Sequence, residues 1–169
     1  MMIFSQVNAL RISVLASVVA LGAAFVAQYG FNLLPCVLCL YQRWPYAVVI
    51  AIGIVGLTFA KTRRSSAFLF LILIAAGFAV TAGIGGFHVG VEQGWWAGTA
   101  ECAADTGKVL SMEDLKAQIL DAPIAKCDEP AWQMLGISMA GYNLIFASLL
   151  AVYALAAAFK GRKTGEELA

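Results

Sequence analysis

The chain has 169 residues, of which 62% are hydrophobic and only 12% are charged, and its mean hydropathy is +0.84. Soluble domains average about half apolar and about a quarter charged residues, so this composition excludes an ordinary soluble domain. The net charge of +1 says little about partners, but the chain has no basic cluster of the kind that marks nucleic-acid binding, so no nucleic-acid partner is expected.

Four apolar stretches are long enough to cross a bilayer, which takes about 20 mostly apolar residues. They cover approximately residues 12–28, 41–60, 67–87 and 136–159. The first is short and ends in small residues, so a cleaved signal peptide is its alternative interpretation. The four stretches predict an all-α membrane protein, a single domain over residues 1–169 folded as an antiparallel four-transmembrane-helix bundle. Small residues such as Gly22 and Gly77 are expected to let helices approach closely.

The basic residues between these stretches indicate how the chain lies in the membrane. One side carries seven of them: Arg11, Lys61, Arg63, Arg64, Lys160, Arg162 and Lys163. The other side carries four basic residues: Arg43, Lys108, Lys116 and Lys126. It also carries eight of the ten acidic residues. Because Lys and Arg are enriched in cytoplasmic loops, both termini are expected in the cytoplasm. The loops at about 29–40 and 88–135, which carry all the cysteines, are then expected to face outward.

The longer of these outward loops has a helical pattern of its own. Ser111, followed three residues later by Asp114, resembles the capping box of a helix N-terminus. Apolar residues then recur at helical spacing: Met112, Leu115, Ile119 and Leu120. The pattern predicts a short amphipathic helix lying on the membrane surface.

The four cysteines form two pairs of different spacing. Cys36-Val37-Leu38-Cys39 directly precedes the second apolar stretch, whereas Cys102 and Cys127 lie in the long outward loop. A disulfide between the cysteines of a Cys-x-x-Cys pair adds almost nothing to the stability of a fold. The usual use of such a pair is redox chemistry, because the neighbouring thiol and local dipoles stabilise a thiolate. Two pairs that exchange disulfides would form an electron relay. Four cysteines allow three pairings, so the resting disulfide pattern stays open.

A relay beside a membrane needs an electron acceptor. The sequence has no nucleotide-binding loop, Fe–S ligand cluster or convincing set of haem ligands, so a membrane quinone is the expected acceptor. Arg43 follows Cys39 by four residues, on the same helical face, where a guanidinium would favour the thiolate and a reduced acceptor. Snorkelling toward lipid headgroups is the alternative for Arg43. His88 and Glu92 also share a face; they are candidates for holding a quinone oxygen or shuttling protons, or else are a polar pair at a helix end.

Two other classes of function use the same thiols. One is a metal-handling membrane protein that binds a soft ion such as Cu(I), or a zinc site completed by the second pair. The other is a scaffold with fixed disulfides, in which closing the loop between Cys102 and Cys127 would contribute about 3 kcal/mol. The metal alternative is disfavoured because that pair lacks the close spacing of zinc ligands and the apolar stretches lack the residues of an ion path. No resident metal is therefore expected.

Taken together, these residues resemble the DsbB family. The resemblance rests on four apolar stretches, on Cys36-Val37-Leu38-Cys39 running into Leu40-Tyr41-Gln42-Arg43-Trp44-Pro45-Tyr46, on the cysteine pair in the second outward loop and on Trp132-Gln133-Met134-Leu135-Gly136. It covers nearly the whole chain. It implies a multi-pass enzyme of the bacterial inner membrane that reoxidises a DsbA-like thioredoxin-fold protein in the periplasm and passes the electrons to ubiquinone or menaquinone.

The same resemblance implies roles for five residues. Cys102 is expected to form the mixed disulfide with the DsbA-like partner, and Cys127 is its pair. Cys36 and Cys39 are the membrane-proximal pair, with Cys39 nearest the quinone ring, and Arg43 supports the reaction with the quinone. The expected activity is that of a protein-disulfide:quinone oxidoreductase. The resemblance assigns nothing to His88 or Glu92.

Overall fold

Four long helices make up most of the computed structural model, which describes residues 5–60, 66–99, 102 and 125–166. They are α1 (Gln6–Phe25, continued by the π-helical turn η2, Val26–Gly30), α2 (Val37–Ala60), α3 (Ser66–Glu92) and α5 (Met139–Glu166). Each contains a segment long and apolar enough to cross a membrane. The predicted all-α membrane bundle is therefore confirmed.

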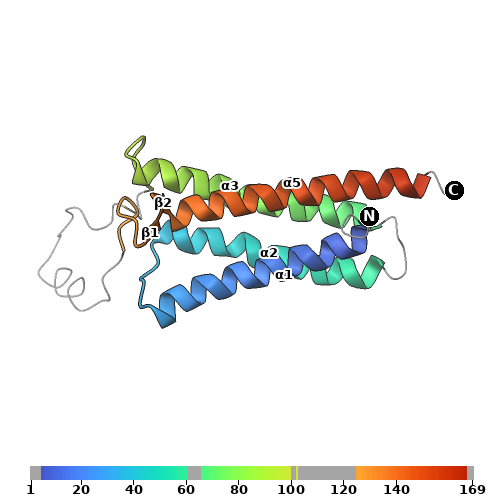
Figure 1. Cartoon of the computed structure of the whole chain (residues 1–169), viewed down its shortest axis with the longest axis horizontal. Coiled ribbons are helices and arrows are strands. Elements are labelled where there is room, and N and C mark those ends of the chain that lie inside the picture. Colours follow the sequence, from blue (N-terminus) through green and yellow to red (C-terminus); the bar gives the residue numbers. More distant parts are fainter. Residues whose placement is uncertain (1–4, 61–65, 100–101, 103–124, 167–169) are drawn as a thin grey trace, which may run out of the picture.

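The helices run antiparallel, as Figure 1 shows. The start of α1 and the end of α5 lie at one end of the bundle. The opposite end carries the α1–α2 connection, the end of α3 and a small hairpin of β1 (Gln133–Met134) and β2 (Ile137–Ser138). All four cysteines belong to this opposite end, which is called the cysteine end below.

The helices differ from the predicted spans at several ends, since α1 begins at Gln6, α2 begins at Val37 and the last helix runs on to Glu166. Helix α3 continues to Glu92, beyond its predicted end at residue 87, and His88 and Glu92 lie in its last turns on the shared face expected from their spacing. The fourth helix begins at Met139, because the preceding residues form the hairpin, whose turn residues Leu135 and Gly136 both have positive φ (53° and 76°). Tight hairpin turns require this backbone conformation, which apolarity alone does not reveal. The amphipathic helix predicted around residues 111–120 lies outside the described residues.

The interior and the outer surface of the bundle are both apolar, as a membrane protein requires. Leu10, Val49, Leu71, Ile74 and Phe78 are fully buried between the helices. Large apolar side chains also cover the outside, among them Leu15, Val19, Ile54, Leu69, Leu149 and Val152. Such a surface is stable in contact with lipid chains and unfavourable in water.

Polar backbone groups inside the bundle are satisfied across helices. Pro45 lies within α2, where it cannot donate a helical hydrogen bond. One turn earlier, the Gln42 carbonyl accepts a hydrogen bond of 2.9 Å from Thr81 Oγ1 on α3. This contact ties the two helices together just inside the cysteine end.

The close helix approach expected at the small residues occurs at Gly77 and does not occur at Gly22. A Cβ at Gly77 would lie 2.6 Å from Cγ2 of the fully buried Val49, whereas a Cβ at Gly22 meets nothing within 4 Å.

We predict that Gly77→Ala lowers the free energy of unfolding by about 1–3 kcal/mol through overpacking. The matched variant Gly22→Ala is expected to stabilise the helix by up to about 1 kcal/mol. Thermal unfolding in detergent measures both; equal effects would contradict the packing assignment.

Candidate active site at the cysteine end

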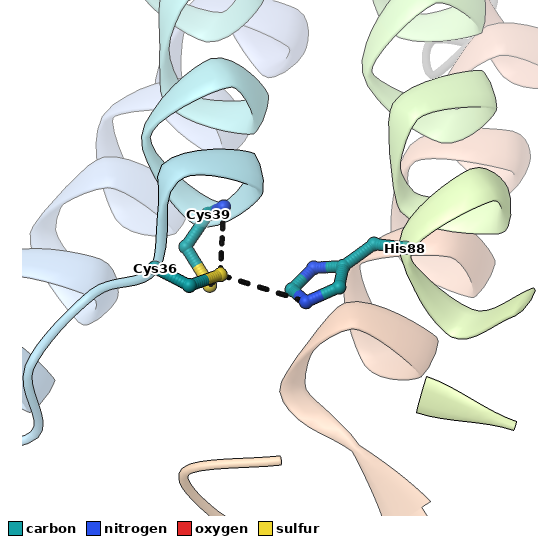
Figure 2. A group of neighbouring side chains, drawn as sticks. All are labelled: Cys36, Cys39 and His88. Atoms are coloured by element: carbon teal, nitrogen blue, oxygen red, sulfur yellow. Dashed lines mark hydrogen bonds between the residues drawn. The ribbon is translucent and has the colours of Figure 1, made fainter. Parts of the chain in front are cut away.

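Cys36 and Cys39 are held together at the N-terminus of α2 (Figure 2). The Cys36 sulfur accepts a hydrogen bond of 3.3 Å from the Cys39 backbone N–H, and the Cys36 carbonyl accepts one of 3.1 Å from Leu40, so Cys36 caps the helix. The Cys36 thiol donates to the Cys39 sulfur at 2.8 Å. The helix N-terminus favours negative charge on this pair.

Of the two thiols in the reduced pair, Cys36 holds its proton more tightly. Its hydrogen bond to Cys39, together with burial, raises the pKa of Cys36 above the ordinary value. Cys36 is 3% exposed, while Cys39 is only half-buried. Cys39 is therefore the more accessible sulfur of the pair and the one free to react.

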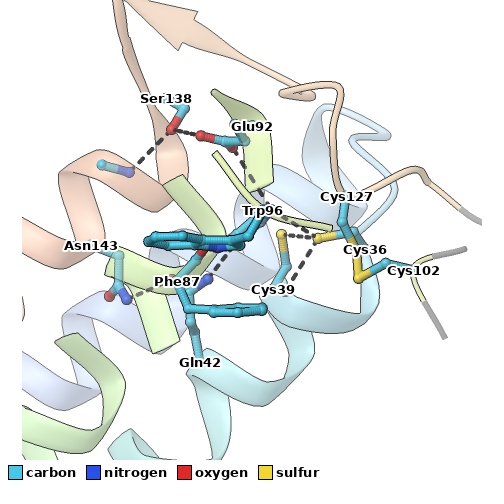
Figure 3. Close-up of polar contacts among 12 residues, drawn as sticks. Cys36, Cys39, Gln42, Phe87, Glu92, Trp96, Cys102, Cys127, Ser138 and Asn143 are labelled. Atoms are coloured by element: carbon cyan, nitrogen blue, oxygen red, sulfur yellow. Dashed lines mark hydrogen bonds and ion pairs between the residues drawn. A yellow bond between two sulfur atoms is a disulfide. The ribbon is translucent and has the colours of Figure 1, made fainter. Parts of the chain in front are cut away.

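Cys102 and Cys127 form a disulfide with Cα atoms 5.5 Å apart, while Cys36 and Cys39 are free thiols. Of the three possible pairings, this is the one present in the structure. Cys127 is 1% exposed, and Cys102 is half-buried. Figure 3 draws this disulfide next to Cys36. All four cysteines, with Leu38, Val91 and Ala125, belong to one apolar cluster.

Within that cluster each pair has one buried and one more accessible sulfur. Cys36 and Cys127 are the buried members and will be called the inner sulfurs. Cys39 and Cys102 are the more accessible members, the outer sulfurs. This division gives each pair one sulfur enclosed within the cluster and one sulfur accessible from outside it.

His88 and Glu92 lie beside the inner sulfur Cys36. His88 Nε2 is 3.5 Å from Cys36 Sγ and 3.8 Å from Glu92 Oε1, and the two side chains are 4% and 5% exposed. The backbone of Cys127 also interacts with His88. The second oxygen of Glu92 accepts a hydrogen bond from Ser138 at the start of α5. His88 thus contacts one residue of each cysteine pair.

A chain of side-chain hydrogen bonds leads from His88 into the bundle. Gln42 Nε2 lies 3.0 Å from His88 Nδ1, and Asn143 Nδ2 donates to Gln42 Oε1 at 2.6 Å. Tyr46 donates its hydroxyl to Asn143 Oδ1, also at 2.6 Å. With the amides in this orientation Gln42 is the donor, so His88 Nδ1 accepts and the ring hydrogen lies on Nε2, facing Cys36.

Cys39 also lines a cleft of about 410 Å³. Its polar lining consists of Cys39, Gln42, Arg43, Tyr46, Tyr142 and Asn143. The remaining wall is largely apolar and comes from α1, the α1–α2 connection and α5, with Val19, Ala23, Leu33, Leu34, Met139 and Phe146 among its residues. A mostly apolar wall with a few convergent polar groups is typical of a small-molecule site.

Arg43 is fixed at this cleft by two contacts to the end of the first transmembrane helix. Its Nη1 donates a hydrogen bond of 2.6 Å to Gln28 Oε1, and its guanidinium lies 5.4 Å from the centre of the Phe25 ring. The side chain is half-buried. A positive charge is thereby held close to Cys39 and to whatever occupies the cleft.

The comparisons with known proteins identify the family. Residues 7–157 match the family described as "Disulfide bond formation protein DsbB". The chain belongs to the DsbB family. An uncharacterised protein from Rickettsia prowazekii is 32% identical over 81% of this chain and 78% of its own length. Relatives named "Disulfide bond formation protein B" include one from Mannheimia succiniciproducens, 30% identical over 86% of this chain and 83% of its own length, and one from Aromatoleum aromaticum, 27% identical over 80% and 81%. No solved structure gives a significant match.

Membership of the DsbB family makes this protein a disulfide-bond-forming oxidoreductase of the bacterial inner membrane. Of the residues selected from the sequence, the structure brings all four cysteines into one cluster and places Arg43 in the cleft. His88 and Glu92 are not among the residues that line the cleft: His88 contacts Cys36, and Glu92 pairs with His88.

Three residues of this DsbB-family site were missed by sequence reasoning. Gln42, Tyr46 and Asn143 line the cleft and, through the chain of hydrogen bonds, join it to His88. The sequence does contain a signal for them, because all three are uncharged polar residues inside otherwise apolar stretches. Gln42 and Tyr46 also lie close to the cysteine motif. Polar groups in a membrane interior are costly and usually functional.

Proposed function

We propose that this member of the DsbB family oxidises the dithiol of a DsbA-like thioredoxin-fold protein and passes the electrons through its two cysteine pairs to a membrane quinone, ubiquinone or menaquinone. The observation that carries the proposal is the arrangement of the sulfurs: one apolar cluster contains both pairs, and Cys39 also lines the cleft. The cysteine end would face the periplasm, with both termini in the cytoplasm.

The first half of the reaction is disulfide exchange with the partner. A partner thiolate attacks Cys102, the outer sulfur of the disulfide, forming a mixed disulfide and releasing the Cys127 thiolate. The second partner thiol then resolves the mixed disulfide, so the partner leaves oxidised and Cys102 and Cys127 are reduced. Half-burial of Cys102, against full burial of Cys127, supports attack at Cys102.

The second half moves two electrons from the loop pair to the membrane. The Cys127 thiolate attacks Cys36 in the oxidised Cys36–Cys39 disulfide, and Cys102 resolves the bond, which leaves Cys36 and Cys39 reduced. Cys39 then donates the electron pair to a quinone in the cleft, the Cys36–Cys39 disulfide re-forms, and the two thiol protons complete the quinol. The hydrogen on His88 Nε2, which lies 3.5 Å from Cys36 Sγ, is positioned to stabilise the Cys36 thiolate when it forms during these steps.

The cleft suits the head group of a quinone. Its volume of about 410 Å³ and apolar wall fit a flat ring, and Arg43, Gln42, Tyr46 and Asn143 offer hydrogen bonds to ring oxygens. Mixing the reconstituted protein with a reduced thioredoxin-fold partner and either quinone tests the proposal. One quinol should form per partner dithiol oxidised, and the faster quinone identifies the acceptor. Partner oxidation without quinol formation would refute the route.

The proposed orientation has its own test. A reporter that is active only in the periplasm and one that is active only in the cytoplasm are fused separately after residue 166. Activity of the cytoplasmic reporter alone is expected, since the last helix ends at the opposite end of the bundle from the cysteines. A periplasmic signal would reverse the orientation and remove access of the partner to Cys102.

Arg43→Ala is predicted to raise the KM for quinone by about 10- to 100-fold, because hydrogen bonds to charged groups contribute about 1.5–3 kcal/mol. The disulfides should still form, since Arg43 contacts Gln28 and Phe25 and no described contact joins it to the loop pair. Steady-state rates at a series of quinone concentrations measure the effect. Arg11→Ala, an exposed arginine of α1 well away from the cysteines, is the control. An unchanged KM in Arg43→Ala would remove its role.

A further inference from the structure

We propose that the reduced Cys36–Cys39 pair and His88 form a binding site for a soft or borderline divalent cation, with Zn²⁺ as the best fit. The three candidate ligand atoms, Cys36 Sγ, Cys39 Sγ and one ring nitrogen of His88, all lie within 4.8 Å of one another. Figure 2 shows the His88 ring directed at Cys36 from the facing helix. Two thiolates and an imidazole are ligands that zinc prefers in proteins.

The geometry requires only small adjustments to hold the ion. Zinc bound at about 2.3 Å from sulfur and about 2.0 Å from nitrogen places its ligands about 3.3–3.8 Å apart. The present separations are 2.8 Å between the sulfurs and 3.5 Å between Cys36 Sγ and His88 Nε2. The sulfurs would therefore move apart by about 1 Å, which rotation of the half-buried Cys39 side chain can supply.

Charge and burial favour the ion over two separate thiolates. Binding replaces the protons of both thiols, so each Zn²⁺ bound releases two protons and leaves a neutral Zn(S–Cys)₂ unit. A neutral unit is compatible with the buried position of Cys36 and His88, whereas two bare thiolates are not. The positive end of the α2 dipole further lowers the cost of forming the thiolates.

The surroundings supply an outer shell for these three ligands. Glu92 Oε1 lies 3.8 Å from His88 Nε2, and its other oxygen accepts a hydrogen bond from Ser138, so a carboxylate is held next to the imidazole. The Gln42 side-chain amide lies 3.0 Å from His88 Nδ1. If the Gln42 and Asn143 amides turn over together, Gln42 Oε1 accepts the Nδ1 hydrogen, Asn143 Oδ1 accepts from Gln42 and the Tyr46 hydroxyl accepts from Asn143. His88 Nε2 is then free to bind the metal, which is the usual arrangement of a zinc-bound histidine.

The ligands come from positions that sequence spacing does not connect, since Cys36 and His88 are 52 residues apart. The zinc alternative considered from the sequence relied on Cys102 and Cys127, which are instead joined to each other. Because the ion needs both sulfurs of the first pair as thiolates, metal binding and the Cys36–Cys39 disulfide exclude each other. Bound Zn²⁺ would thus keep Cys36 and Cys39 reduced and stop turnover. This effect on turnover rests on the proposed function, whereas the binding of Zn²⁺ does not.

Equilibrium titration of the purified full chain in detergent tests the site without any partner or quinone. The protein is reduced, desalted under anaerobic conditions and titrated with Zn²⁺ against a coloured competing chelator. We expect one ion per chain in the reduced protein, none after treatment with a general thiol oxidant, and unchanged affinity in the Cys102→Ser/Cys127→Ser double variant. Cys36→Ser and His88→Ala should weaken binding by more than about 100-fold, and Gln42→Leu by about 10- to 100-fold. Glu129→Gln, at an exposed position, is the control.

A second measurement on the unmodified chain guards against misfolded variants. The ¹¹³Cd NMR shift of the cadmium-loaded reduced protein should report two sulfur ligands together with nitrogen or oxygen. Failure of the reduced chain to bind Zn²⁺, equal binding by the oxidised chain, or unchanged affinity in Cys36→Ser or His88→Ala would overturn the site. If Zn²⁺ binds but thiol-dependent quinone reduction is absent, the proposed function is wrong and the metal site is still supported. If quinone is reduced but Zn²⁺ does not bind, only the metal site is wrong.

Discussion

Cys39→Ser is expected to abolish quinone reduction driven by the thioredoxin-fold partner, with turnover falling by at least about a thousandfold. The reason is chemical: Cys39 is the half-buried sulfur that lines the cleft, and a serine oxygen neither forms a disulfide nor donates an electron pair to a quinone. The absorbance change of the quinone on reduction measures the rate. Binding of the reduced partner should be unaffected, since the disulfide that meets it is intact.

The matched control places the same side chain on the adjacent position. Leu40 follows Cys39 in α2, is 42% exposed and is not among the residues that line the cleft. Leu40→Ser should therefore retain most of the turnover. Comparable activity in Cys39→Ser and Leu40→Ser would show that Cys39 is not the donor to the quinone, and the relay would have to end at another residue.

Cys102→Ser is expected to block partner oxidation to a similar extent and, in the presence of quinone, to accumulate a new disulfide between Cys36 and Cys127. Without Cys102 the Cys127 thiol is unpaired beside the oxidised pair, and attack on Cys36 releases the Cys39 thiolate. Cys36 and Cys127 are the two inner sulfurs, 3% and 1% exposed in one apolar cluster, so they are the sulfurs best placed to join. Peptide mapping by mass spectrometry detects the cross-link.

The opposite variant serves as the comparison for this trap. In Cys127→Ser the remaining loop sulfur, Cys102, is an outer one and should cross-link to the first pair less completely. Equal yields of cross-link in the two variants would mean that the loop sulfurs reach the first pair without preference. The assignment of Cys127 as the internal donor would then be wrong.

Much of the fold was readable from the sequence because hydropathy and helix length are linked in a bilayer. The four apolar stretches gave the bundle, and an antiparallel arrangement necessarily brings the two cysteine-bearing segments to one end. Helix ends were less readable: His88 and Glu92 continue α3 because nothing in their side chains stops a helix. The hairpin before Met139 depends on a positive φ at Leu135, a residue type that rarely adopts it.

The site itself was only partly predictable. The cysteines and Arg43 follow from local spacing along one segment, whereas the contact of His88 with Cys36 joins residues 52 positions apart. The contacts among Gln42, Tyr46 and Asn143 depend on how α2 and α5 are rotated about their axes. Helices that are apolar on every side have no amphipathic pattern, so the sequence does not show which face of each helix is buried.

Burial of the two inner sulfurs also bears on chemical durability. Stepwise oxidation of cysteine to sulfenic, sulfinic and sulfonic acids depends on thiolate character and on access for the oxidant. Cys36 and Cys127 are nearly inaccessible, and Cys102 is held in its disulfide, so Cys39 is the accessible free thiol. Peroxide should therefore oxidise Cys39 first, and the damaged enzyme should lose electron transfer to the quinone while the disulfide that meets the protein substrate stays intact.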